Sequence, residues 1–264
     1  MRTFSYPAEY LEELPLVTAE QASAISERML GVNNQTRYQM MECAGLAVSR
    51  IALQYTSEIY PRIAILVGKG DTAGCALVAA KNLARRGGRL QVILTESPQN
   101  LREAPKVQLE ILQGLYQETP VHDLSELTAD TLPEMPECDL IIDGLLGMGI
   151  RGVPREPLAT LISTANNAAV PTISVDLPSG LHPDSGLPAL PTILAAATVC
   201  LGIPKTGLTQ NRAQSFLGEV YLADIGLCPE VIESVLQDLS FPRKLPPILH
   251  LYTKRREHFT LSGL

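Results

Sequence analysis

The chain has 264 residues, of which 45% are hydrophobic and 19% charged, a composition that is typical of a folded globular protein and excludes general disorder. Its net charge is −7 and its sequence pI is about 5.2. Because such a surface repels phosphate backbones, we expect no broad nucleic-acid interface. The five cysteines form no CxxC pair and the four histidines no HExxH or HxH motif. The sequence therefore gives little support to a zinc site and favours free thiols in a reducing compartment.

We expect neither a signal peptide in the N-terminal segment nor a membrane span in the chain. The N-terminal segment lacks an apolar h-region, and no apolar run in the chain approaches the ~20 residues of a membrane span. We therefore expect a cytoplasmic protein without a membrane segment. Residues 1–14 are predicted to form an irregular arm, and Thr18 and Gln21 then match the two ends of a helix capping box. Helices are predicted over 18–30 and about 38–55.

A buried strand, a glycine-rich turn and a helix follow. Residues 62–67 form a near-continuous apolar run, which is typical of a strand buried on both faces. The turn 68–74 is predicted to lead into a helix from about residue 75 to 86, and the next strand is predicted at 90–94. Because such crossovers are right-handed, the two strands should be parallel neighbours.

The alternation continues to the end of the sheet. Further helices are predicted at about 101–117 and 156–168, and further strands near residue 121 and at 140–143, 172–176, 198–202 and 219–223. This order predicts one domain over residues 1–264, with a doubly wound, Rossmann-like, three-layer α/β/α fold and a mostly parallel sheet of about six or seven strands. Residues 242–264 are expected to form a C-terminal tail that runs over the surface.

Three loops at predicted carboxyl ends of strands have unusual compositions, and ligands of open parallel sheets bind there. The first, 68–74, is rich in glycine and precedes a helix N-terminus, an arrangement suited to a phosphate. Gly68, Gly70 and Ala73 fit the dinucleotide fingerprint, and Glu96 is a candidate ribose-binding acid after the next strand. A tight turn without a ligand produces the same pattern.

The other two loops each begin with an aspartate that ends an apolar strand. Asp143 is expected to be buried and therefore needs a partner, which is a cation, backbone amides or Arg151. Asp176 opens a turn whose path is restricted by Pro178. Two carboxylates at neighbouring strand ends suggest a bound cation or an acid–base pair, although an aspartate that only caps its loop produces the same pattern.

A series of segments in chain order resembles the YjeF N-terminal family, the NAD(P)H-hydrate epimerases. The family patterns are an opening helix, MENAG, GxGNNGGDGLVAA, DALFGTGLxG, VDIPSG, APKxGL and DIG. The corresponding segments here are LVTAEQ (16–21), MECAG (41–45), GKGDTAGCALVAA (68–80), DGLLGMGIRG (143–152), VDLPSG (175–180), 197–208 and 223–226. The match covers nearly the whole chain, and only residues 1–14 and about 241–264 fall outside it.

The resemblance implies an isomerase that interconverts the R and S epimers of hydrated NADH and NADPH at ring carbon C6. This cofactor-repair reaction supplies a dehydratase, which we expect to be a separate polypeptide, and a homodimer is also implied. Asp176 would act at the reacting ring with help from Lys205, and a potassium ion would be held by Thr72, Asp143 and Ser179. The implied contacts of the hydrated cofactor, besides Asp176, are Asp71, Thr72, Ala73, Gly74, Cys75, Gly147, Met148, Gly149, Ile150, Arg151, Gly152 and Val153.

The glycine-rich turn departs from the family pattern. Asp71 and Thr72 replace two adjacent asparagines, Cys75 replaces an aspartate, and Cys43 replaces the asparagine of MENAG. Asp71 adds negative charge where a pyrophosphate would approach the helix start. The alternative is therefore a non-catalytic member of the family that binds a nucleotide or a partner. An NAD-dependent oxidoreductase that uses Glu96 at the ribose is a third hypothesis.

Overall fold

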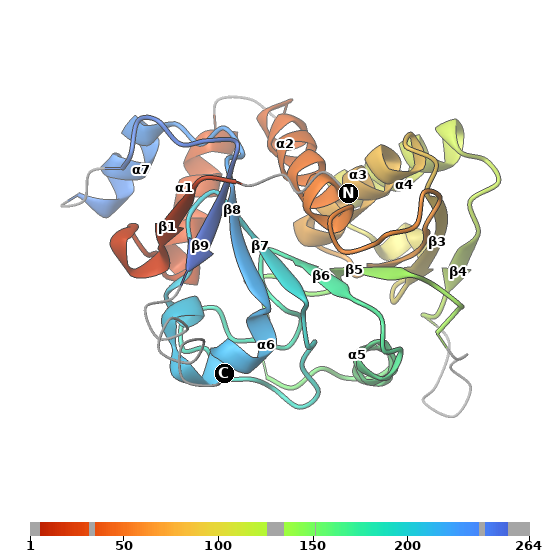
Figure 1. Cartoon of the computed structure of the whole chain (residues 1–264). Helices are drawn as coiled ribbons and strands as arrows, with labels where there is room; N and C mark the ends of the chain where they lie inside the picture. The colour runs from red at the N-terminus through yellow and green to blue at the C-terminus, as the bar shows by residue number, and fades with distance from the viewer. Residues whose placement is uncertain (1–5, 32–34, 126–134, 151, 238–240, 253–264) are drawn as a thin grey trace.

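The computed structural model describes residues 6–31, 35–125, 135–150, 152–237 and 241–252. Its described residues form a nine-stranded sheet in the order β1-β9-β8-β7-β6-β5-β2-β3-β4 (Figure 1). Within this part of the chain β8 and β9 run antiparallel and the other neighbours run parallel. The strands are β1 (Ala8–Tyr10), β2 (Arg62–Val67), β3 (Arg89–Leu94), β4 (Val121–Asp123), β5 (Leu140–Gly144), β6 (Thr172–Val175), β7 (Ala197–Leu201), β8 (Glu219–Ala223) and β9 (Ile248–Tyr252).

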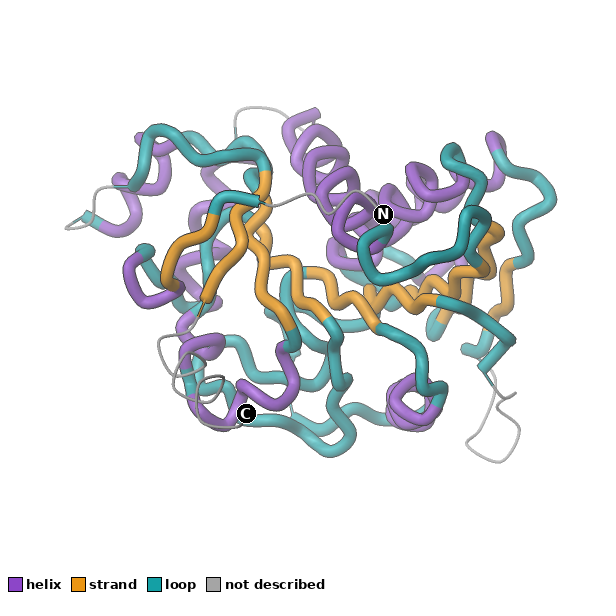
Figure 2. The backbone as a smooth tube through the Cα atoms, in the orientation of Figure 1, coloured by secondary structure: helices purple, strands orange, loops and turns teal. Residues whose placement is uncertain are grey.

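Helices cover both faces of the sheet, which confirms the predicted doubly wound α/β architecture (Figure 2). Helices α2, α3 and α4 pack on one face, and α5 and α6 lie on the other. The α-helices are α1 (Ala19–Leu30), α2 (Gln35–Ala52), α3 (Asp71–Ala84), α4 (Glu103–Leu115), α5 (Leu158–Asn167), α6 (Gln214–Leu217) and α7 (Pro229–Leu236). In the described part of the chain, no helix has the length and apolar character that crossing a membrane requires.

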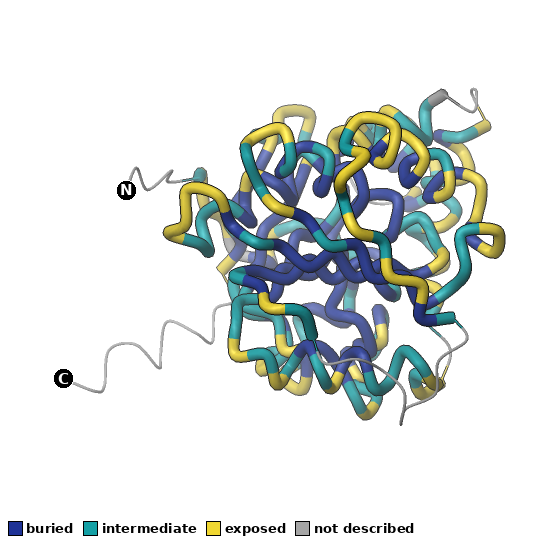
Figure 3. The backbone as a smooth tube through the Cα atoms, turned by 90° about the vertical axis from the view of Figure 1, so that its right-hand side faces the viewer, coloured by how far each residue is buried: buried dark blue, intermediate teal, exposed yellow. Residues whose placement is uncertain are grey.

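The central strands are apolar on both faces because each face is covered. In β2, Ile63, Ile65 and Val67 pack with the helices α2, α3 and α4. Ala64 and Leu66 point the other way and pack with α5. Figure 3 shows this burial as a dark band along the middle of the sheet. The continuous apolar runs therefore follow from the two-sided cover, as expected for parallel strands.

Helix α3 begins at Asp71, earlier than the predicted start near Cys75. Gly70 is its N-cap residue, so the second half of the glycine-rich segment belongs to the helix. Gly74 lies where α3 crosses α2, and a Cβ there would come within 2.9 Å of the Met41 sulfur. This glycine therefore permits close helix packing and is not part of a turn.

The two ends of the chain differ from the prediction, since both contribute strands to one side of the sheet, β1 at its edge and β9 next to it. The supposed irregular arm holds β1, which pairs parallel with β9, and the supposed surface tail holds β9 itself. Leu249 and Leu251 of β9 are buried together with Leu11. Strands this short have little local signal, because they are stabilised by partners far away in the sequence. That residues 1–264 form one domain stays a prediction.

Candidate active site

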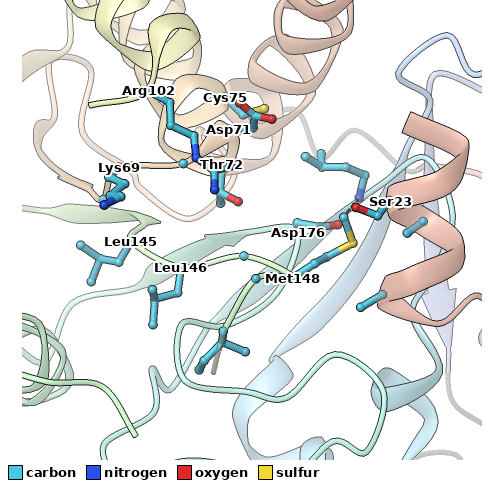
Figure 4. A pocket seen from close by; sticks show the side chains of 18 of the residues that line it. Ser23, Lys69, Asp71, Thr72, Cys75, Arg102, Leu145, Leu146, Met148 and Asp176 are labelled. Atoms are coloured by element: carbon cyan, nitrogen blue, oxygen red, sulfur yellow. Dashed lines mark hydrogen bonds between the residues drawn. The ribbon is translucent and has the colours of Figure 1, made fainter. Parts of the chain in front are cut away.

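A cavity of about 800 Å³ opens at the carboxyl ends of the central strands, where the sequence places the ligand (Figure 4). The loops after β2, β3, β5, β6 and β7 form its wall together with α1 and α2. Arg151 lies outside the described residues. The predicted site residues that line the cavity are Asp71, Thr72, Cys75, Gly147, Met148, Gly149, Ile150, Gly152, Val153, Asp176 and Lys205.

Asp176 is held rigidly at the end of β6 although its backbone is in the left-handed region. Its φ is +69°, which is uncommon for a residue other than glycine. The end of β7 fixes this conformation, because the Asp176 amide donates to Val199 O (2.8 Å) and Oδ1 accepts from the Leu201 amide (3.0 Å). Within the described residues the other carboxylate oxygen, Oδ2, accepts no hydrogen bond. Asp176 therefore presents one fixed oxygen and one available oxygen at the cavity.

Lys205 forms a buried ion pair with the fixed oxygen. Its Nζ lies 2.5 Å from Asp176 Oδ1 and 3.2 Å from Leu201 O. The lysine backbone is tied to the segment before α1, because Val17 bridges to Lys205 and the Val17 amide donates to Pro204 O at 3.0 Å. The two residues to which the resemblance assigns the chemistry are thus brought together from the segments that follow β6 and β7, and the N-terminal segment holds the second.

Asp143 and Ser179 come together behind the cavity wall. Ser179 donates to the Asp143 carboxylate through its hydroxyl (2.5 Å) and its amide (2.9 Å). The Ser174 hydroxyl (2.8 Å) and the Leu145 amide (3.3 Å) complete this shell. Burial raises the pKa of the Asp143 carboxyl, and these hydrogen bonds act in the opposite direction. Of the three kinds of partner expected for Asp143, the structure shows backbone amides, and the hydroxyl groups of Ser174 and Ser179 also donate to the carboxylate.

The first and second loops meet at Thr72 and Gly147. A Cβ at Gly147 would fall 2.2 Å from Thr72 Oγ1, so only glycine allows this approach. Of the three predicted potassium ligands, Thr72 therefore lines the cavity, and Asp143 and Ser179 are buried beneath it. Ala73 and Gly74, two predicted cofactor contacts, lie on the buried side of α3.

Arg37 neutralises the charge that Asp71 brings to the start of α3. Its Nη1 lies 3.2 Å from Oδ1 and 3.4 Å from Oδ2 of Asp71, and it reaches them from α2. Both side chains are part-exposed at the cavity wall. The electrostatic cost that the sequence predicts for an approaching anion is therefore reduced by this pair.

Cys75 stays uncharged at neutral pH. Burial raises the pKa of its thiol strongly, and the nearby carboxylates Asp176 and Asp71 raise it further. A thiol in this position is a poor nucleophile, because the thiolate is the reactive form. The position that holds an aspartate in the family pattern thus carries a neutral side chain here.

Sequence reasoning did not identify several residues of the cavity wall. Ser23 points from α1 toward the region of Asp176, and Arg102 points from the start of α4 toward Thr72 (Figure 4). Lys69 lies inside the glycine-rich turn, so the motif itself could have identified it as a residue near the ligand. The others lie on polar helix ends or faces that are indistinguishable in sequence from a solvated surface.

The chain matches a model of a known protein family. A family model described as "YjeF-related protein N-terminus" matches residues 37–207. An NAD(P)H-hydrate epimerase of Cenarchaeum symbiosum is 33% identical, over 75% of this chain and 89% of the relative. Two proteins named bifunctional NAD(P)H-hydrate repair enzyme Nnr are 38% (Gloeobacter violaceus) and 30% (Salinibacter ruber) identical, over 75% and 83% of this chain. The chain spans only 37% and 42% of their lengths.

A solved structure shares the fold. The crystal structure of yeast ynu0, YNL200c, superposes with a TM-score of 0.71 and is 22% identical in sequence. The alignment covers 90% of this chain and 100% of the yeast chain. The likeness extends over most of the described sheet and its helices.

Proposed function

Because this chain belongs to the family of YjeF-related protein N-termini, we propose that it interconverts the R and S epimers of hydrated NADH and NADPH at C6. The observation that carries the proposal is Asp176, whose Oδ2 is available at a cavity formed by strand-end loops. The name of the Cenarchaeum symbiosum relative, which the chain covers almost fully, supports the same reaction.

Asp176 is assigned the proton transfer. C6 carries a hydroxyl group beside the ring nitrogen N1, and its configuration is lost in either of two ways. The hydroxyl leaves as water after it accepts a proton, and water returns to the opposite face. Alternatively, the hydroxyl gives up its proton as the C6–N1 bond breaks and N1 takes up a proton, and N1 then attacks the other face of the resulting aldehyde. Both routes move a proton to and from one carboxylate oxygen, the role assigned to Oδ2.

Lys205 is a positioning residue in this proposal. Its ammonium group binds Oδ1, so that the carboxylate rotates little and Oδ2 stays directed at the cavity. General acid–base catalysis depends on such fixed geometry. Asp71, Thr72, Cys75 and the part of loop 147–153 that is described supply the wall along the dinucleotide. Ala73 and Gly74 support this wall from the core.

A potassium ion fits the region of Asp143. The carboxylate is fully buried, and within the described residues no cationic side chain pairs with it. Hydroxyl and carbonyl oxygens lie close by, since Ser179 Oγ is 3.4 Å from Leu146 O. An oxygen-only donor set suits a large, weakly hydrated cation. The described residues contain no cluster of three or more His, Cys, Asp or Glu side chains for a transition metal. Asp143, Ser179 and Thr72 would hold the potassium ion, which would compensate the buried charge.

The proposal extends to the reaction that follows. The repair enzymes that match this chain are named bifunctional, and the chain spans less than half their length. We therefore place it before an activity that removes water from the S epimer. Homodimer formation and a cytoplasmic location stay predictions from the sequence.

The test is a coupled assay with purified protein. The protein is incubated with a mixture of R and S hydrated NADPH together with an S-specific dehydratase. The dehydratase alone consumes the S form rapidly and the R form only as fast as R converts spontaneously. Added protein should accelerate consumption of the R form in proportion to its concentration. An R-form rate equal to the spontaneous rate contradicts the proposed function.

A further inference from the structure

Two positive charges lie on the cavity wall away from Asp176. Lys69 follows β2, Arg102 is the N-cap residue of α4, and the Arg102 amide donates to Lys69 O at 3.1 Å. This backbone hydrogen bond holds the two residues at one place in the wall. Figure 4 shows them on the opposite side of the cavity from Asp176, with Thr72 between. Both side chains are exposed, and neither forms an ion pair with a carboxylate among the described residues.

Among the described residues, three cations of the cavity wall form no ion pair: Lys69 and Arg102, which lie together, and Arg155 on the loop after β5. Arg37 is occupied by Asp71, and Lys205 is occupied by Asp176. The chain as a whole carries a net charge of −7, so an unneutralised pair of cations is a local exception. Guanidinium and ammonium groups placed together bind a phosphate through charge-assisted hydrogen bonds.

The sheet order sets the distance between this place and the reacting ring. Asp176 ends β6, and Lys69 and Glu96 follow β2 and β3, with β5 between β6 and β2. Three strand spacings of about 4.8 Å separate β6 from β3, or about 14 Å. A dinucleotide with its nicotinamide ring at Asp176 would extend across these strand ends toward β3. In nucleotide-binding sheets of this order, the second ribose of the dinucleotide lies at the end of the second strand, here β3.

Resting on the function proposed above, we propose that Lys69 and Arg102 form a subsite for the 2′-phosphate of hydrated NADPH. Hydrated NADH lacks this phosphate and leaves both cations without a ligand. The subsite therefore makes the protein prefer the phosphorylated substrate. Glu96 lines the same part of the cavity and opposes this preference, because its carboxylate repels a phosphate and accepts a hydrogen bond from an unmodified 2′-hydroxyl.

The test compares binding of NADP⁺ and NAD⁺ by calorimetry, because these ligands differ only in the 2′-phosphate. The wild type should bind NADP⁺ more tightly than NAD⁺. Each of Lys69→Ala and Arg102→Ala should reduce this ratio about tenfold, since one charge-assisted hydrogen bond is lost. Glu96→Gln should increase the ratio, an effect that damage to the fold does not produce. Lys106→Ala is the matched control, because it removes an exposed charge from α4 outside the cavity wall.

The outcomes separate this subsite from the proposed function. A wild type that binds both ligands equally, or a ratio that survives Lys69→Ala and Arg102→Ala together, overturns the subsite. A ratio that falls in these variants, rises in Glu96→Gln and is unchanged in Lys106→Ala supports it, even if the coupled assay shows no epimerisation. In the active protein, the ratio of kcat/KM for hydrated NADPH over hydrated NADH should follow the same order, mainly through KM.

Discussion

Lys205 Nζ lies 2.5 Å from Asp176 Oδ1, and both side chains are almost completely buried, with 3% and 7% exposed. The two residues lie in the segments that follow β6 and β7, and the lysine is further tied to the N-terminal segment through Val17. Removing one member of such a buried pair leaves an uncompensated charge. The pair therefore fixes both the carboxylate and the chain segments that meet beneath the cavity.

We expect Asp176→Asn to reduce epimerisation at least a hundredfold, because an amide cannot exchange a proton with the C6 hydroxyl as a carboxylate does. The loss should appear in kcat, since the amide retains the shape of the side chain. The measurement is the initial rate of R-form consumption in the coupled assay, with folding checked by thermal unfolding.

Asp123→Asn is the matched control for that variant. Asp123 is also a carboxylate at the end of a parallel strand, β4, but it is exposed and does not line the cavity. Its rate should equal that of the wild type. A rate for Asp176→Asn within tenfold of the wild type, in folded protein, removes Asp176 from the proton transfer.

The central fold was accessible from sequence because its signals are local. Residues 63–67 and 140–142 are apolar without alternation, and this pattern is typical of strands that are covered on both faces. The strands β1 and β9, at one side of the sheet, lack such a pattern. Their formation depends on pairing between residues such as Ala8 and His250, which no local window contains.

Part of the candidate site could also be predicted from the sequence, because some of its residues give local signals. Asp143 and Asp176 are charged residues at the ends of apolar strands, and such a local exception to the pattern is expected at functional sites. Arg37 and Arg102 carry no such signal, since their relation to the cavity depends on how α2 and α4 are rotated against the sheet. The same dependence explains Ala73 and Gly74, which the turn motif includes and the helix places on its buried side.

Potassium should stabilise the wild type against heat. A cation bound at Asp143 in the folded state alone raises the free energy of unfolding by RT ln(1 + [K⁺]/Kd), or about 2.7 kcal/mol at a hundredfold excess over Kd. We expect Tm to rise by several degrees in potassium chloride relative to choline chloride at equal ionic strength.

Asp143→Asn should abolish this rise, because it removes the charge that the cation compensates. It should also lower Tm itself, since the amide nitrogen faces donors from Ser174 and Ser179. Ser179→Ala is a milder second variant that should weaken the rise. Equal Tm values of the wild type in the two salts contradict a potassium site.

The acid stability of the fold should depend on Asp139. Its hydrogen bonds with Arg62, which join the starts of β2 and β5, hold the pKa of the Asp139 carboxyl at about 2, below its ordinary value of 3.8. A lowered folded-state pKa contributes stability above pH 3.8, and this contribution is lost as the pH falls from 3.8 to about 2. The pair lies near the surface, so the contribution should be about 1 kcal/mol.

Urea unfolding of the wild type and Asp139→Asn at several pH values measures this contribution. The variant should be less stable at pH 7, and the two curves should converge as the medium approaches pH 2. Asp123→Asn, at an exposed strand end, should follow the wild type throughout. A difference between wild type and Asp139→Asn that is independent of pH contradicts the assigned ion pair.

Restoring the family pattern tests whether the altered turn limits catalysis. Asp71→Asn releases Arg37 from its ion pair and removes the negative charge at the start of α3. Cys75→Asp places a carboxylate close to Asp176 in a buried site, where like charges raise the pKa of one member and create an acid beside a base.

The triple variant Asp71→Asn, Thr72→Asn, Cys75→Asp should therefore consume the R form at least tenfold faster than the wild type. Its Tm should be lower, because a second carboxylate is buried near Asp176. Cys75→Ala in the same background is the control, since it removes the thiol without adding a charge. If only the triple variant is active, the natural chain is a non-catalytic binding member of its family. An unchanged rate in the folded triple variant shows that these positions do not limit the reaction, and that Asp176 and Lys205 suffice in the present surroundings.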